Sequence, residues 1–163
     1  MGGEDETRRI VDPALSFVDA RLAKLVLYWR EHAKNGGIPD RAAFGPEALH
    51  QLGLIANVVL FDVIDGGARF RIRLVASGLT AMSGRDNTGR FLDELYPAEI
   101  YEPMAESMRW TLSERRPLRT KGTFAMVGKE FIAYEGFTAP LTNGGAEATM
   151  IITAVVRRNR GAT

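Results

Sequence analysis

Two segments of the chain carry apolar residues at the spacing of an amphipathic helix. The apolar residues of the first segment recur every three or four positions and share one face, which consists of Leu15, Val18, Leu22, Leu25 and Trp29. Asp12 followed by Pro13 is a typical helix start, so the pattern predicts a helix of roughly twenty residues that begins there. Such a face must be covered, either by the rest of the domain or by a second copy of the chain.

The second helical segment covers residues 98–114. Tyr101, Met104 and Met108 follow one another at three- and four-residue steps and fall on one side of that helix. Residues 76–95, which precede it, are interrupted by three glycines and predict only short helical pieces. Together these segments predict a helical block between two groups of strands.

Five further segments have the apolar patterns of β-strands: residues 57–63, 69–75, 118–126, 130–141 and 148–156. The first and the last are apolar on both faces, which is typical of strands in the middle of a sheet. The order of elements predicts an α+β domain with a five-stranded, mostly antiparallel sheet and helices on one of its faces. With the last strand beside the first, the expected spatial order is 2-1-5-4-3.

The predicted strands also set the boundaries of the domain. Residues 1–12 are polar and predict a frayed tail, and residues 13–56 hold the first helix and a connecting segment. Residues 57–156 form the core, and residues 157–163 are a short basic tail.

The second strand carries three arginines on one face, Arg69, Arg71 and Arg73, about 7 Å apart. Arginine is suited to bind phosphate or carboxylate, so this row could form an anion site or contact nucleic acid. The interpretation we favour is a charged edge strand that resists pairing with another sheet. Arg73 lies nearest the helical block, where Asp86 or Asp93 could pair with it.

Composition removes several kinds of chemistry. The 163 residues include no cysteine, which excludes disulfides, thiolate metal sites and a cysteine nucleophile. A net charge of +1 is too balanced for a dedicated nucleic-acid binder. The two histidines, His32 and His50, lie in separate segments, so we expect neither a two-histidine metal site nor a catalytic triad. No segment resembles a membrane span or a signal peptide, and we therefore expect a cytoplasmic protein.

Five segments of the sequence carry a further signal. They are YWREHAKNGGIPDR (28–41), FGP (44–46), RFRIRLVASGLTAMSGRDNTGRFLDEL (69–95), ERRPLRTKG (114–122) and FIAYEGFTAPL (131–141). In this order and spacing they resemble the segments of a PAS domain, and the arginine-bearing strand followed by GRDNTGR is the most specific of them. The resemblance spans residues 25–156 and is strongest to a bacterial subfamily of PAS-type sensory domains with a leading helix.

The resemblance implies a non-catalytic sensory or interaction module that acts in signal transduction. It also implies a space between the concave face of the sheet and the helical block, where ligands of this superfamily bind. In this sequence the residues expected there are Phe70, Ile72, Arg73, Tyr101, Met104, Met108 and Tyr134. These residues either bind a small apolar ligand or simply fill the core, since protein interiors are close-packed.

The sequence lacks the residues that two cofactors of PAS domains require. A blue-light PAS domain needs a cysteine for its flavin adduct, and the chain has none. Heme-binding PAS sensors generally use a histidine on the long helix, and residues 98–114 contain no histidine. We therefore expect no cysteinyl flavin, heme or bound metal ion.

The resemblance also implies a dimer, and we expect the apolar face of the first helix to form its contact. A separate effector protein would then receive the signal. The main alternative is a small α+β enzyme or binding protein with the cone-shaped fold of the ketosteroid isomerases and an open cleft. That fold has no helical block between its second and third strands, which argues against it here.

Overall fold

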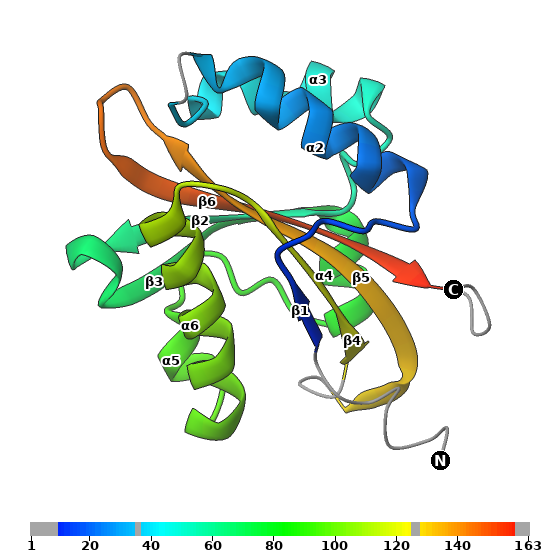
Figure 1. The fold of residues 1–163 in the computed structure, drawn as a ribbon. Helices are drawn as coiled ribbons and strands as arrows, with labels where there is room; N and C mark the ends of the chain where they lie inside the picture. Colours follow the sequence, from blue (N-terminus) through cyan, green and yellow to red (C-terminus); the bar gives the residue numbers. More distant parts are fainter. Residues whose placement is uncertain (1–9, 35–36, 125–127, 159–163) are drawn as a thin grey trace.

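Six antiparallel strands form one sheet within the part of the chain that the structure describes, residues 10–34, 37–124 and 128–158. The structure is a computed structural model, and its fold is drawn in Figure 1. The strands are β1 (Ile10–Asp12), β2 (Val58–Ile64), β3 (Arg69–Val75), β4 (Leu118–Phe124), β5 (Lys129–Thr142) and β6 (Ala148–Arg158). The helices are α2 (Ala20–His32), α3 (Pro46–Gln51), α4 (Ser77–Ser83), α5 (Leu92–Leu95) and α6 (Ala98–Glu114), with 3₁₀ turns at Arg41–Phe44 and Asp65–Gly67.

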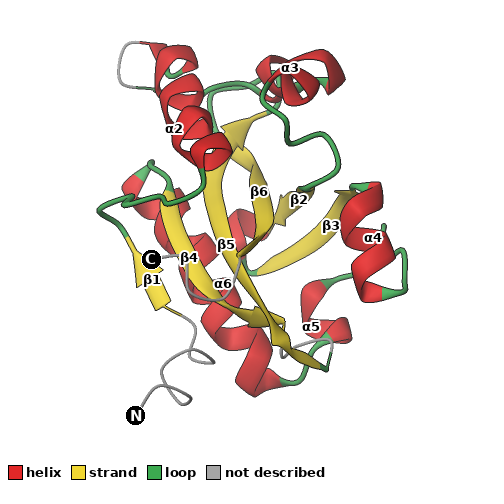
Figure 2. Ribbon diagram, turned by 90° about the vertical axis from the view of Figure 1, so that its right-hand side faces the viewer, coloured by secondary structure: helices red, strands yellow, loops and turns green. Residues whose placement is uncertain are grey.

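The strands lie in the order β1-β4-β5-β6-β2-β3, which Figure 2 shows from one edge of the sheet to the other. Counted from the β3 edge, the first five of these strands have the predicted order 2-1-5-4-3, so that prediction is confirmed. β6 lies between β5 and β2, as its two apolar faces require. Lys121 of β4 lies opposite Glu135 of β5.

β1 is the strand that the sequence did not predict. Residues 10–12 belong to the predicted frayed tail, but they pair with β4, with Ile10 opposite Lys121 and Asp12 opposite Arg119. A strand of three residues is too short to produce the alternating pattern on which strand prediction depends. The side chain of Asp12 adds further contacts at this edge, which are described below.

The remaining parts of the two predicted tails lie outside the described residues. These parts are residues 1–9 and 159–163. Arg157 and Arg158 belong to β6, so the core extends two residues beyond its predicted end at position 156.

Helices cover both faces of the sheet. In Figure 1, α2 and α3 lie above the sheet, and α5 and α6 lie below it. Because side chains alternate along a strand, each central strand contributes to both layers. On β6, Ile152 and Ala154 belong to the core cluster under α2, whereas Ile151 belongs to the cluster under α6.

α2 begins at Ala20, and its predicted start at Asp12–Pro13 is wrong. The side chain of Asp12 accepts hydrogen bonds from the backbone N–H groups of Ala14 at 2.9 Å and Ser16 at 3.1 Å. These bonds fold the segment into a turn, which competes with helix formation. The N-cap is Asp19 instead, and its side chain accepts a hydrogen bond from the N–H two residues later at 2.8 Å.

The apolar face of α2 packs inside its own chain. Leu22 and Leu25 are fully buried and Trp29 is 4% exposed, all in a cluster with β5 and β6. The indole N–H of Trp29 donates a hydrogen bond to a backbone oxygen of β5 at 3.1 Å. Leu15 is half-buried against the same cluster, and Val18 is exposed. The sheet of the same chain covers Leu22, Leu25 and Trp29, so the prediction that these three residues form a dimer contact is wrong.

A β-bulge changes the side-chain alternation predicted for β3. Ile72 and Leu74 pair with neighbouring residues of β2, so Arg73 between them is an extra residue in the ladder. The bulge reverses the faces of the residues that follow it. Leu74 is 40% exposed and does not share the buried face of Ile72, whereas Val75 packs toward the helical block.

We predict that Leu25→Ala lowers the free energy of unfolding by about 2–5 kcal/mol, because it leaves a cavity between α2 and the sheet. Leu27→Ala is the matched control, since Leu27 lies on the same helix and is 58% exposed, and its truncation should change that energy by about 0.5 kcal/mol or less. Urea unfolding followed by circular dichroism measures both variants. Equal effects would contradict the packing of this face against the sheet.

Candidate functional site

A cavity of about 160 Å³ lies between the sheet and the helices α4, α5 and α6. The sheet contributes side chains from β2, β3, β4 and β6. Most of the wall is apolar and consists of Val59, Phe61, Ile72, Val75, Leu79, Leu92, Tyr96, Met104, Phe124 and Val155. Polar groups come from Ser83, Arg85, Asn87 and Thr153. A hollow with this chemistry suits a small, mostly apolar molecule with a few polar contacts.

A second cavity of about 100 Å³ lies beside the first, under α6. The two cavities share Phe61, Met104, Phe124, Thr153 and Val155. The other residues of the smaller cavity are Ser107, Met108, Thr120, Tyr134 and Thr138. The hydroxyl oxygens of Thr138 and Thr153 lie 3.2 Å apart across β5 and β6, so the floor of this cavity carries a polar pair.

Four of the seven residues predicted for the ligand site line these cavities: Ile72, Met104, Met108 and Tyr134. Phe70 and Tyr101 are 1% and 7% exposed in the core beneath α5 and α6, where they support the wall without lining it. Arg73 lies outside the cavities, because the bulge in β3 leaves its side chain 51% exposed at the surface.

Most polar residues of the wall were missed by the sequence prediction. Thr138 and Thr153 each lie within a short apolar run, FTAPL (137–141) and IITAVV (151–156), and that departure is a signal that could have marked them. Arg85 and Asn87 lie in the loop after α4. No periodic pattern indicates where a loop side chain points, so the sequence held no signal for these two residues.

The arginines of β3 form surface ion pairs. Arg69 contacts Asp93 at 2.8 Å. Arg73 lies 3.7 Å from Asp62 of β2, so its predicted pairing with Asp86 or Asp93 is wrong. The loop before α5 also hydrogen-bonds to the outer edge of β3, with N···O distances of 2.7 and 2.9 Å. These contacts agree with a charged and partly covered edge strand, rather than with an open anion site.

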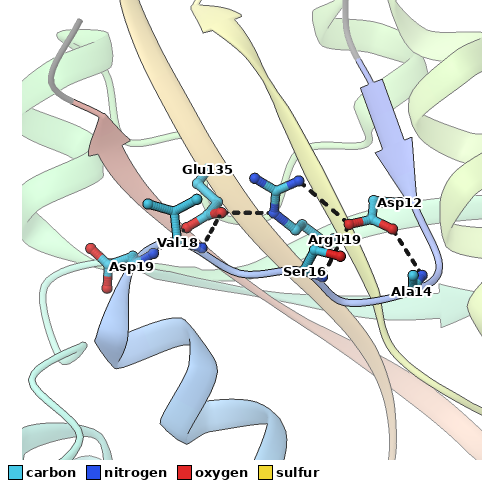
Figure 3. Close-up of polar contacts among 7 residues, drawn as sticks. All are labelled: Asp12, Ala14, Ser16, Val18, Asp19, Arg119 and Glu135. Carbon is cyan, nitrogen blue, oxygen red and sulfur yellow. Dashed lines mark hydrogen bonds and ion pairs between the residues drawn. The ribbon is translucent and has the colours of Figure 1, made fainter. Parts of the chain in front are cut away.

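The most deeply buried charges lie on the opposite face of the sheet (Figure 3). The carboxylate of Glu135 is fully buried and accepts hydrogen bonds from the backbone N–H groups of Val18 at 2.9 Å and Asp19 at 2.8 Å. The Nε of Arg119 donates to the same carboxylate at 2.7 Å, and Arg119 also pairs with Asp12 at 3.4 Å. This cluster fastens the segment before α2 to β4 and β5, so its role is structural. Glu135 pairs with Arg119 although it lies opposite Lys121 in the ladder.

The pKa values of Asp12 and Tyr96 are both shifted further from neutral pH. Burial raises the pKa of Asp12, but hydrogen bonds from Ser16 and Ala14 and the charge of Arg119 outweigh it, and the pKa lies below the usual 3.8. Burial raises the pKa of Tyr96, against the opposing effect of a nearby arginine. Neither group is thereby suited to exchange protons at neutral pH.

Within residues 10–34, 37–124 and 128–158, no group of three or more His, Asp or Glu residues is placed to hold a metal ion. Within the same ranges, no helix combines the length and the hydropathy needed to cross a lipid bilayer.

A family model described as PAS domain matches residues 19–155. The chain belongs to the PAS domain family. The match extends from the N-cap of α2 into β6 and includes every element that lines the cavities. Domains of this family are generally sensory and non-catalytic. Among curated proteins, none matches the sequence.

Several solved structures are similar to this PAS domain. An RNA-binding light-oxygen-voltage receptor has a TM-score of 0.52 at 15% identity, over 93% of this chain and 38% of that chain. A light-oxygen-voltage domain studied with a flavin analogue has a TM-score of 0.47 at 16% identity, over 70% of this chain and 84% of that one. A domain of an HTR-like protein from Haloarcula marismortui ATCC 43049 has a TM-score of 0.48 at 12% identity, over 63% of this chain and 97% of that chain. At such identities the receptor supports the fold alone.

We predict that Glu135→Gln lowers the free energy of unfolding by about 3 kcal/mol or more, because Arg119 then stays buried without the charge of its partner. Glu94→Gln is the control, since that carboxylate pairs with Arg69 at the surface and its loss should change the energy by about 1 kcal/mol or less. Guanidinium unfolding at neutral pH measures both variants. A loss at Glu135 no larger than that at Glu94 would contradict the structural role of the cluster.

Proposed function

We propose that this PAS domain is a sensory module that binds a small molecule between its sheet and helices α4–α6 and passes on the signal without catalysing a reaction. The observation that carries the proposal is the cavity of about 160 Å³ beneath Met104. The wall of this space is mostly apolar, and an apolar occupant is favoured there because its binding removes apolar surface from water. This observation favours ligand sensing over the alternative in which the same residues only fill the core.

The size of the cavity limits the proposed ligand to a small molecule. A cavity of about 150 Å³ can hold benzene, whereas sites for drug-sized ligands measure about 300–1,000 Å³. The neighbouring cavity adds only about 100 Å³. The flavin of the similar light-oxygen-voltage domain therefore does not fit this space, and the chain has no cysteine with which to form an adduct.

The proposed absence of catalysis is supported by where the ionisable groups lie. Acid–base catalysis needs such groups to converge on a substrate. Arg119 contacts both Glu135 and Asp12 on the face of the sheet that is turned away from the cavity, and the described residues that line the two cavities include no Asp, Glu or His. The helical block between β3 and β4 also disfavours the cone-shaped alternative, in which those strands would enclose an open cleft.

We also propose that the module acts in the cytoplasm and delivers its signal to a second protein chain. Val18 and Leu27 are 45% and 58% exposed beside the apolar face of α2, outside the core. Such exposed apolar side chains can take part in a protein contact. A second copy of this chain or a separate effector would suit this surface.

Benzyl alcohol and indole test whether the cavity binds small molecules. Equilibrium dialysis should show saturable binding to the wild-type chain. The affinity of Met104→Trp should be lower than that of the wild type by about tenfold or more, because its larger side chain fills the space. Leu27→Trp is the control, because it adds the same side chain at an exposed position on the other layer and should bind as the wild type does. Equal binding by the two variants, or none by the wild type, would overturn the proposal.

A further inference from the structure

Arg85 is a solvent-exposed residue at the rim of the larger cavity, where the other lining residues are apolar or neutral. In the described part of the chain its guanidinium makes no ion pair and no hydrogen bond, in contrast to Arg69, which contacts two carboxylates. A guanidinium carries five N–H donors in a fixed plane and stays charged at any physiological pH. The rim of the cavity therefore presents a cation that no described protein group neutralises.

The backbone that carries Arg85 is fixed to the end of α4. Gly84 takes a left-handed conformation with φ 77°, and its N–H donates to the carbonyl oxygen of Thr80 at 2.9 Å. The hydroxyl of Ser83 donates to the carbonyl oxygen of Arg85 at 2.9 Å. These bonds fix the backbone position from which the Arg85 side chain extends to the rim of the cavity.

The nearest acidic residues in the sequence are already engaged elsewhere. The carboxylate of Asp86 accepts hydrogen bonds from the backbone N–H of Thr88 at 3.0 Å and from its hydroxyl at 2.5 Å. The carboxylates of Asp93 and Glu94 contact Arg69. None of them neutralises Arg85, so its charge is available to an anion in the cavity.

Two further residues give the polar end of the cavity its character. The charge of Arg85 acts on the phenol of Tyr96, which lines the same wall and sits in largely desolvated surroundings. The side-chain amide of Asn87 also lines this wall and has no hydrogen-bonding partner among the described residues. An anion beside Arg85 could thus accept hydrogen bonds from both a guanidinium and an amide.

We propose that the ligand of this cavity is a small apolar monocarboxylate, with an aromatic ring or a short hydrocarbon chain in the cavity and its carboxylate bound to Arg85. This inference rests on the proposed function and specifies its ligand. A planar carboxylate matches the paired N–H donors of a guanidinium, and such charge-assisted bonds are short and strong. A dianion such as a phosphate monoester suits the site less well, because the wall supplies one cation and the adjacent Asp86 repels a second negative charge.

Benzoate, benzyl alcohol and phenyl phosphate are matched probes, since they share a ring and differ in charge. By equilibrium dialysis or calorimetry, the wild-type chain should bind benzoate about tenfold or more tightly than benzyl alcohol. Arg85→Gln should remove that preference by weakening the binding of benzoate. Arg85→Lys should retain part of it, because an ammonium keeps the charge but cannot bind a carboxylate with two parallel bonds.

Arg30→Gln is the control, because Arg30 is an exposed arginine on α2, on the other side of the sheet, and its loss should leave all three affinities unchanged. Benzoate binding no tighter than benzyl alcohol, or an unchanged preference in Arg85→Gln, would overturn the carboxylate assignment while the proposed cavity site stands. Phenyl phosphate binding more tightly than benzoate would also overturn it. If none of the three probes binds, both this inference and the proposed function fail.

Discussion

The alternation of side chains along a sheet covered on both faces is the constraint on which this structure depends. On β5, Tyr134 and Thr138 line the cavity, while Glu135 and Phe137 lie on the α2 side. Gly136 is required between them, because a Cβ there would lie 2.7 Å from the hydroxyl oxygen of Thr120 on the neighbouring strand. A shift of one residue would put Glu135 into the apolar cavity and Tyr134 under α2, so the register and the site are specified together.

The same alternation places a structural anchor directly behind the proposed site. The carboxylate of Glu135 holds the segment before α2 through two backbone N–H groups and through Arg119. Because Glu135 follows Tyr134 in the chain, the cavity and this anchor share one strand.

The sequence was sufficient where a regular pattern extended over many residues. The five long strands, their order and the helix at residues 98–114 follow from hydrophobic periodicity, and Met104 and Met108 follow from their spacing on that helix. The start of α2 did not follow, because the bonds between Asp12, Glu135 and the segment at residues 13–19 join positions far apart in the sequence.

The polar residues of the site could not be predicted from the sequence, for a similar reason. A bulge in β3 turns Arg73 out to the surface, and a strict two-residue period cannot anticipate an inserted residue. Arg85 enters the wall from a loop whose direction depends on the end of α4 and on Gly84. Local periodicity thus specifies the apolar frame of the cavity, and contacts between distant segments specify its polar groups.

Methionine methyl groups allow the most direct test, because Met104 and Met108 line the cavities while Met150 is buried under α2 on the other face. The wild-type chain, labelled with ¹³C at the methionine methyls, would be titrated with benzoate and separately with benzyl alcohol and followed by NMR. The account predicts saturable shifts of the Met104 and Met108 signals and a Met150 signal that stays in place. No shift with either compound, or a shift of Met150 as large as those of the other two, would contradict it.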